Sequence, residues 1–294
     1  MVIVNVKAGR LANRLIHFSH FIANSIEYDY KLIYPHFREY LELFDPANSA
    51  TFNQYNISIK FTRNKGIDRI LILFFRIVGL LVPRHHRRIP FIAFHDLREM
   101  DRLEQKFDLN TPEFITMAKN KLTFVNGWGY RDNSSFQKFS SEIRCFFKPR
   151  EPFRDQIADV IRSCRQKGNV IVGMHIRRGD YDTFFDGKWF FDDDVYAKKM
   201  GEMENLMSLC DKHCVFLLCS DESIERSNFS GFDIVAENRP AIVDLYALSE
   251  CDYIIGPPST FTLWASFFGN VPLFILTRPE LNLYLHNFRI IKNC

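Results

Sequence analysis

Hydrophobic positions along the chain alternate between short β-branched runs and longer stretches at helical spacing. The opening run VIVNV, residues 2–6, has the composition of a strand, and apolar side chains then recur every three or four positions through residues 13–28. The run KLIYP at 31–35 follows as a second strand and ends at a proline. A strand, a loop, a helix and a strand in this order predict an α/β fold.

The second half repeats this alternation more regularly. We expect strands at 170–175, 214–220, 253–256 and 271–276, and helices at 192–208, 242–252 and 260–269. Strands that alternate with helices predict a doubly wound parallel sheet. A further strand is expected at 122–128, whereas residues 36–120 give a weaker pattern.

A change of composition separates the two halves. The segment FFKPREPF at 146–153 places two prolines and several charges between apolar stretches. Such a segment is typical of a domain boundary. We therefore expect one domain at 1–150 and another at 151–294, with a cleft between them.

Composition and charge exclude several classes of protein. With 47% hydrophobic and 25% charged residues over 294 positions, the chain is neither disordered, collagen-like nor a coiled coil. Its 38 basic and 35 acidic residues leave a net charge of only +3, so we expect no nucleic acid partner. The start MVIVNVKAG lacks the features of a signal peptide, and no apolar run reaches the roughly 18 residues of a membrane span. These features predict a cytoplasmic protein.

One apolar run permits two interpretations. Residues 70–82, ILILFFRIVGLLV, precede a basic cluster at 84–88. The pattern favours a core helix followed by a solvated loop, because the run lacks a clean polar face. The alternative is an interfacial helix whose basic flank contacts anionic lipid, so that 70–88 would hold the protein on the inner face of the membrane.

The cysteines offer a candidate metal site and a simpler interpretation. Cys210, Cys214 and Cys219 lie close together with His213 in the sequence. However, Cys214 and Cys219 bound the apolar run CVFLLC, which favours buried cysteines in a strand.

Polar residues interrupt the packing pattern after three predicted strands, where ligands of open α/β sheets bind. The first interruption, KAGRLAN, places Arg10 and Asn13 at the start of a helix, a favourable position for an anion. A tight turn with a surface arginine explains it equally well. The third, GPPSTF, places Ser259 and Thr260 at another helix start, where they either cap the helix or also bind phosphate.

The second interruption, HIRRGDY, gives the most specific signal. Alternation along a strand places His175 and Arg177 on one face and Arg178 on the other. Guanidinium groups bind phosphate oxygens in bidentate fashion, so we favour an anion site. A surface salt bridge between Arg178 and Asp180 explains neither His175 nor the second arginine. No P-loop motif is present, and the three loops together suit a nucleotide-diphosphate sugar.

At HIRRGDY the sequence resembles glycosyltransferase family 11, the α-1,2-fucosyltransferases, within the GDP-fucose-using superfamily. VKAGRLANRL is similar to the family's N-terminal glycine-rich motif, and VDLYALSECDYIIGPPSTFTLWASFFG to its C-terminal motif. DGKWFFDDDVYAKKM is similar to the stretch after the arginine motif. The resemblance implies a GT-B-type fold with two Rossmann-like domains, the first on the acceptor side and the second binding GDP-fucose. It also implies an inverting reaction that needs no metal or other cofactor.

The resemblance assigns the arginine motif to the donor's diphosphate. Arg177 would neutralise the charge that grows on the leaving GDP, His175 and Arg178 would position that group or the fucose, and Asp180 would orient an arginine. Arg10 and Asn13 would line the cleft from the first domain.

Other roles follow the remaining motifs. Ser259, Thr260 and Phe261 would hold phosphate and sugar. Either Asp221 or Asp244 would accept hydrogen bonds from the guanine edge.

The inverting reaction implied by the resemblance calls for a base that takes the proton of the acceptor hydroxyl, although an oxocarbenium-like transition state would need only a weak base or none. Asp182 and Asp186 are candidates, although both also fit the description of surface loop carboxylates. The run Asp192-Asp193-Asp194 resembles a metal-binding D-x-D, yet at a helix start it is better explained as favourable N-terminal charge.

The predicted function is therefore transfer of fucose from GDP-fucose to a glycan, most simply α-1,2 to galactose in surface polysaccharide synthesis. A lipid-linked acceptor would give the 70–88 segment a purpose. The pair Arg10 and Asn13 is closer to protein O-fucosyltransferases, so α-1,6 or O-fucosyl transfer is an alternative. A non-catalytic nucleotide-sugar or glycan-binding protein and a membrane-associated scaffold are further alternatives.

Overall fold

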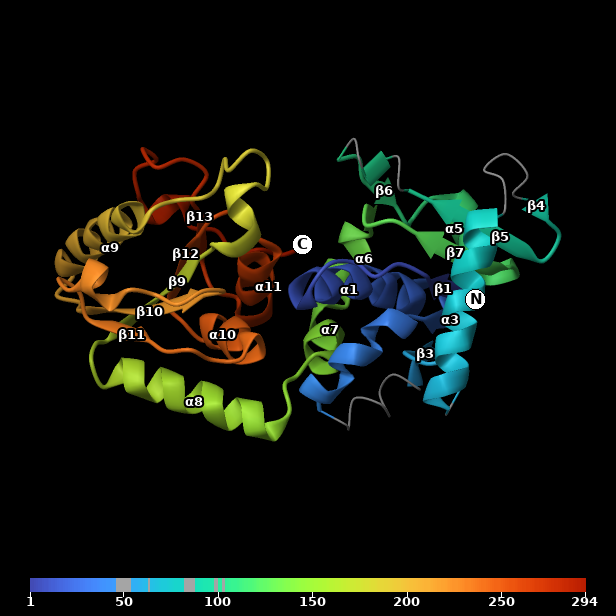
Figure 1. Ribbon diagram of the computed structural model, residues 1–294, viewed down its shortest axis with the longest axis horizontal. Coiled ribbons are helices and arrows are strands. Elements are labelled where there is room, and N and C mark those ends of the chain that lie inside the picture. The colour runs from blue at the N-terminus through green and yellow to red at the C-terminus, as the bar shows by residue number, and fades with distance from the viewer. Residues whose placement is uncertain (46–53, 63, 82–87, 98–99, 102–103) are drawn as a thin grey trace. The chain divides into compact units, whose positions relative to one another are not determined.

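The computed structural model describes residues 1–294 except 46–53, 63, 82–87, 98–99 and 102–103. The chain forms two compact units, Met1–Arg150 and Glu151–Cys294. Each unit contains a largely parallel sheet with helices packed on it (Figure 1). The α/β class predicted from the hydrophobic pattern is confirmed.

The sheet of the first unit has the order β3-β2-β1-β7-β5-β4 among the described residues, and its pairs are parallel except β4 with β5. Its strands are β1 (Val2–Val4), β2 (Leu32–Ile33), β3 (Ile57–Ser58), β4 (Arg88–Ile89), β5 (Ile92–Asp96) and β7 (Leu122–Asn126). A separate pair joins β6 (Phe107–Asp108) to β8 (Tyr130–Arg131). The helical segments are α1 (Leu11–Tyr28), η1 (Pro35–Leu43), α3 (Lys65–Leu81), α5 (Pro112–Asn120), α6 (Asn133–Lys138) and α7 (Ser140–Phe146).

Helix α1 forms the centre of the first core. It follows β1 as predicted and buries an almost continuous run from Leu11 to Ser25. Phe18 contacts Tyr34 and Phe37 with ring centroids 5.0 and 5.1 Å apart. The helix ends at Asp29, whose φ of 50° stops the helical hydrogen-bond pattern.

Helix α3 is covered on only one side. Phe75 packs against Phe61 and Phe124, and buried Asp68 pairs with Arg38 at 2.5 Å. Five large apolar side chains on the outer side are 45–68% exposed: Ile67, Ile70, Leu73, Phe74 and Ile77. The core-helix interpretation is therefore wrong for this face, because apolar residues extend beyond the one stripe that covers the sheet.

Helix α3 ends at Leu81, and residues 82–87 of the predicted 70–88 segment lie outside the described residues. Among the helices that the structure describes, none has the length and hydropathy to cross a bilayer.

The second unit has a fully parallel sheet of order β11-β10-β9-β12-β13. Its strands are β9 (Val170–Ile176), β10 (Cys214–Ser220), β11 (Ile234–Ala236), β12 (Tyr253–Gly256) and β13 (Leu273–Ile275). The helical segments are α8 (Glu151–Arg165), η2 (Gly179–Asp182), α9 (Asp193–Ser208), η3 (Arg226–Phe229), α10 (Ala241–Leu248), α11 (Thr260–Gly269) and η4 (Leu285–Asn287). The four predicted strands are confirmed, whereas β11 and α8 were not predicted.

Strand β9 is buried at every position because helices cover both faces. On one face Val172 and Met174 share a core with Met200 and Met203 of α9. On the other, a Cβ at Gly173 would lie 2.4 Å from Leu248 of α10, so only glycine allows this close packing. Figure 1 shows α8 and α9 on opposite sides of these strands.

The order of the second sheet fixes where a ligand can bind. From β9 the chain proceeds outward to β10 and β11, and then returns to β12 on the other side of β9. The crevice between β9 and β12 is thus a topological switch point, and the loops that follow these two strands lie at its mouth.

Burial explains the strand cysteines. Cys214 and Cys219 lie buried within β10, which confirms the interpretation as buried strand residues, while Cys210 is exposed. In the part of the chain that the structure describes, no three metal-ligating side chains gather into one group.

Candidate active site at the switch point of the second unit

His175 lies at the carboxyl end of β9 and is only 4% exposed. Its ring stacks on Phe261 of α11 with centroids 5.0 Å apart and an angle of 19° between planes. Burial, aided by the nearby Arg177 charge, lowers the pKa of His175 to about 3, so the ring is neutral at physiological pH. Its buried Nδ1 has no hydrogen-bond partner among the described residues.

Arg177 is held at the mouth of the crevice by two carboxylates. Its Nη1 lies 2.6 Å from Asp221 Oδ2, and its Nη2 contacts Asp180. Asp221 Oδ1 also accepts a hydrogen bond of 2.9 Å from the backbone N–H of Arg178. Gly179 has a φ of +46°, and a Cβ there would lie 2.6 Å from Asp221, so the tight turn requires glycine. These contacts fix the guanidinium beside the β9 end while leaving it 15% exposed.

Arg178 has different partners from Arg177, and both residues lie beyond the end of β9 at Ile176. Its guanidinium contacts the carbonyl of Phe191 and the carboxylate of Asp193. Asn228 donates a second hydrogen bond of 2.7 Å to Asp193. Asp193 therefore attaches the start of α9 to the arginine motif, which gives one residue of the acidic run an ion-pairing role.

The loop after β12 meets the loop after β9. Tyr181 Oη donates a hydrogen bond of 2.6 Å to the carbonyl of Pro258. Ser259 caps α11 by accepting a hydrogen bond of 3.2 Å from Phe261 N, and Thr260 opens the helix. The structure thus brings together the predicted site residues of the second and third motifs: His175, Arg177, Asp180, Ser259, Thr260 and Phe261.

Asp244 occupies a buried position at the start of α10. It accepts a hydrogen bond of 2.7 Å from Arg239 Nε, and Arg239 also donates to the carbonyl of Leu218 at 3.0 Å. Burial raises the pKa of Asp244, and the Arg239 charge opposes this shift. Both candidate guanine acceptors, Asp221 and Asp244, therefore have an arginine partner. Arg239 was missed because the strand before it, β11, was not predicted.

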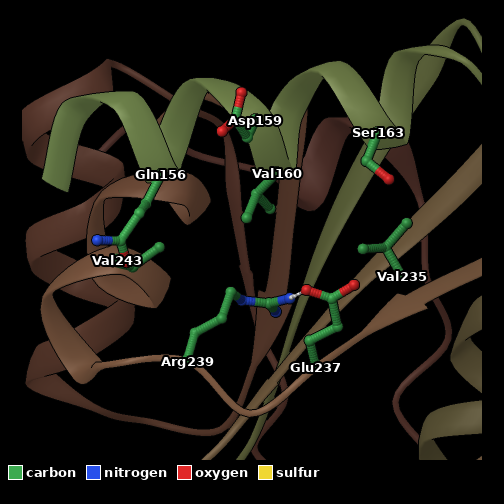
Figure 2. A pocket seen from close by; sticks show the side chains of 8 residues that line it. All are labelled: Gln156, Asp159, Val160, Ser163, Val235, Glu237, Arg239 and Val243. Carbon is green, nitrogen blue, oxygen red and sulfur yellow. Dashed lines mark ion pairs between the residues drawn. The ribbon is translucent and has the colours of Figure 1, made fainter. Parts of the chain in front are cut away.

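Two cavities lie near these residues. One of about 190 Å³ opens beyond the ends of β10 and β11, next to Asp221. It is lined by Ser220, Glu222, Ser223, Ile224, Arg226, Ala236, Glu237 and Asn238. A larger one of about 320 Å³ lies between α8 and β11, where Arg239 and Glu237 face each other (Figure 2). Neither cavity is lined by a residue predicted from the motifs, although Ser220 and Glu222 of the smaller one flank Asp221 in the sequence.

Sequence comparison identifies the group to which these features belong. The sequence profile of glycosyl transferase family 11 matches residues 117–275. The chain belongs to glycosyl transferase family 11. The matched residues run from the end of α5 to the end of β13, so they include the whole switch-point site. A comparison with curated protein sequences finds no match.

Solved structures show the same fold as this family 11 chain. A variant of FUT1 from Arabidopsis thaliana in complex with GDP has a TM-score of 0.60 at 13% identity, over 98% of this chain and 72% of that chain. The fucosyltransferase NodZ from Bradyrhizobium has a TM-score of 0.60 at 16% identity, over 95% and 96%. POFUT1 in complex with GDP-fucose has a TM-score of 0.56 at 12% identity, over 92% and 94%. The GT-B-type fold expected from the resemblance is confirmed.

The first unit of the family 11 chain has its own switch point, between β1 and β7. Gly9 follows β1 with a φ of +52°, and a Cβ there would lie 2.1 Å from Asn13 Nδ2. Arg10 is exposed, whereas Arg14 is buried, donating to the carbonyls of Gly9 and His36. The buried Arg14 side chain therefore holds the turn through its hydrogen bond to the carbonyl of Gly9.

Sequence reasoning missed Trp128 at this switch point. It follows β7, the neighbour of β1, and its ring lies 5.5 Å from that of buried His17 and 4.7 Å from the Arg131 guanidinium. The signal was available at the end of the predicted strand 122–128, whose last residue is Trp128; β7 ends at Asn126, so Trp128 lies in the loop after it.

Asp182 and Asp186, the candidate bases, both lie exposed in the segment that follows β9. Asp186 has a φ of 55° and sits between Phe185 and Gly187, which also have positive φ values. Both carboxylates are therefore accessible to solvent in the segment that follows the arginine motif.

Proposed function

We propose that the protein transfers fucose from GDP-fucose to a glycan hydroxyl, with inversion, forming an α-1,2 link to galactose in surface polysaccharide synthesis. One observation carries this proposal: Arg177, neutral His175 and the start of α11 converge at the switch point of a family 11 chain. The proteins of similar fold named above are fucosyltransferases, some bound to GDP or GDP-fucose, which supports the choice of donor.

The chemistry requires a cation where negative charge develops. As the bond between fucose C1 and the β-phosphate oxygen breaks, its electron pair stays on GDP, and C1 gains the acceptor oxygen on its opposite face. In this proposal the Arg177 guanidinium stabilises the leaving phosphate together with the N–H groups at the start of α11. The acceptor proton passes to Asp182 or Asp186. These protein groups supply the charge, so no metal is required.

The cavity of about 190 Å³ provides a place for the nucleoside. It adjoins Asp221 at the ends of β10 and β11, beside the arginine motif. Carboxylates suit the donor edge of guanine, and Glu222 and Glu237 line this cavity. We therefore place the guanosine here, with Asp221 or Asp244 as further contacts, and assign donor binding to the second unit.

The test is GDP release from GDP-fucose with a galactosyl oligosaccharide in the presence of EDTA, followed by NMR of the product linkage. Turnover without metal and an α-1,2 product are expected. An α-1,6 or O-fucosyl product would overturn the linkage, in favour of the alternative suggested by Arg10 and Asn13. GDP binding without transfer to any acceptor would indicate a non-catalytic binding protein.

We also propose that α3 docks on an anionic membrane, where a lipid-linked acceptor would be found. Residues 60–88 contain eight lysines and arginines and a single acid, Asp68, which is buried and paired with Arg38. The same segment carries the exposed face of Ile67, Ile70, Leu73, Phe74 and Ile77. An apolar helical face with excess positive charge suits the surface of an anionic bilayer.

Vesicle co-sedimentation tests this surface. The wild type is expected to sediment with phosphatidylglycerol vesicles and not with phosphatidylcholine, and Ile70→Ser/Phe74→Ser should abolish binding. Leu209→Ser is the matched control, because Leu209 is 82% exposed in the second unit. Absence of wild-type binding would overturn the proposal. Self-association that is lost in the double variant would assign the face to a second copy of the chain instead.

A further inference from the structure

Large aromatic side chains are exposed immediately after the arginine motif. The segment 183–191, here named the aromatic loop, contains Phe184, Phe185 and Phe190, which are 42%, 50% and 38% exposed. The Phe184 and Phe185 rings lie 4.6 Å apart, and Trp189 lies 5.2 Å from Phe185. Single exposed apolar residues are ordinary, but a contiguous cluster marks a contact surface.

Both arginines of the motif are linked to this cluster, Arg178 directly and Arg177 through Tyr181. The Arg177 guanidinium lies 5.2 Å from the ring centroid of Tyr181, which stacks on Phe184 at 5.3 Å. The Arg178 guanidinium lies 5.2 Å from the ring of Phe190. Because Tyr181 also donates a hydrogen bond to the carbonyl of Pro258, the aromatic surface is continuous with the proposed phosphate site.

The backbone displays one of these rings at a conformational cost. Phe185, Asp186 and Gly187 have φ values of 48°, 55° and 71°, a left-handed region that a bulky residue rarely occupies. Hydrogen bonds of 3.2 Å from Gly187 N to Phe184 O and from Lys188 N to Phe185 O hold the turn. Glycine would fit the left-handed conformation of Phe185 better, and residues in such strained conformations cluster at binding sites.

We propose that the aromatic loop is the platform on which a pyranose ring of the acceptor stacks. The inference rests on the proposed function and specifies the class of group that occupies its acceptor site. A pyranose presents an apolar C–H face to an aromatic ring and hydroxyls at its edge, and Asp182, Asp186 and Lys188 are exposed nearby to bind those hydroxyls. Two carboxylates beside the rings disfavour an anionic lipid headgroup as the occupant.

Phe185→Gly tests the platform because it should move stability and acceptor binding in opposite directions. We expect the melting temperature to stay or rise by a few degrees, since the left-handed backbone suits glycine. The KM for the galactosyl oligosaccharide should rise about tenfold while GDP affinity is unchanged. Phe185→Tyr, which keeps the ring, should retain the wild-type KM.

Asp211→Gly is the matched control. Asp211 has a φ of 55°, is exposed, and lies in the turn before the amino end of β10, whereas the site lies at the carboxyl ends of the strands. The Asp211→Gly variant should lose the same left-handed backbone strain and keep the wild-type KM for the galactosyl oligosaccharide. An unchanged KM in Phe185→Gly would overturn the platform, and so would a parallel loss of GDP binding.

A direct binding measurement separates this inference from the proposed function. Saturation-transfer NMR of the oligosaccharide in the presence of GDP requires no turnover. Wild-type binding that Phe185→Gly weakens, without fucose transfer, would support the platform and refute the transferase. Transfer with full oligosaccharide binding by Phe185→Gly would refute only the platform.

Discussion

Replacing Arg177 by alanine should lower kcat/KM by about 10²–10³-fold. Loss of one charge-assisted contact to the leaving phosphate corresponds to about 3 kcal/mol of transition-state stabilisation, or roughly 10²-fold in rate. The variant also leaves Asp221, whose side chain is 20% exposed, without its partner at 2.6 Å. Its uncompensated charge beside the donor diphosphate adds about 1 kcal/mol of repulsion at a partly solvated site.

A second substitution separates the two contributions. Arg177→Ala/Asp221→Asn removes the repulsion and should recover about fivefold of the lost rate, because about 1 kcal/mol is returned. Arg177→Lys keeps the charge without the planar fork and should give an intermediate rate.

GDP release measured under kcat/KM conditions gives these rates. Arg162→Ala is the control, since Arg162 forms an exposed ion pair with Asp159 on α8 and should keep the wild-type rate. The reasoning would be refuted if Arg177→Ala kept a rate within threefold of wild type. It would also be refuted if Arg177→Ala/Asp221→Asn were slower than Arg177→Ala.

Three further predictions concern stability. Gly9→Ala should lower the free energy of unfolding by at least about 1 kcal/mol, because φ is +52° and the new Cβ would lie 2.1 Å from Asn13; an unchanged thermal midpoint would contradict this. Arg239→Met should cost about 3 kcal/mol in urea unfolding by leaving buried Asp244 unpaired, and Arg239→Met/Asp244→Leu should recover most of it, so equal loss in both would refute the ion-pair argument. The folded pKa of His175 lies near 3, below its unfolded value of 6.5. The contribution of the neutral ring to the free energy of unfolding is therefore fully present above pH 6.5 and is lost as the pH falls toward 3. His175→Gln should therefore reduce the stability difference between pH 7 and pH 5 by about 2 kcal/mol, and an unaltered pH dependence would exclude the buried neutral ring as its cause.

The sequence predicted the second unit better than the first, for a physical reason. Strands buried on both faces, such as 170–175 and 214–220, form continuous apolar runs that are visible without any partner. Short strands leave little signal, and neither the three residues of β11 nor the two of β2 could be delimited accurately. Missing β11 also hid Arg239, since its importance depends on where that strand ends.

The burial of α3 could not be predicted from its own residues. An apolar run that lacks a polar face is compatible with full burial, and only the three-dimensional arrangement shows that contact with Phe61 and Phe124 covers a single stripe. The aromatic loop was overlooked for a related reason: its importance rests on left-handed φ values and ring contacts that no periodicity encodes.

The residues of the arginine motif could be identified from the sequence alone. Strand alternation alone separated Arg177 from Arg178, and the structure gives them different partners, Asp221 for one and Asp193 for the other. What alternation could not supply was the identity of those partners, which lie 44 and 15 positions away in the sequence.

The two carboxylates around Arg177 also bear on how a catalytic cycle would end. Asp221 and Asp180 already balance the guanidinium charge. A phosphate bound by Arg177 competes with them for its N–H groups, so they act as tethered competitors at high local concentration. Stray monovalent anions would gain little from such a site, and a spent diphosphate would be released faster than from a bare arginine, which favours turnover over product inhibition.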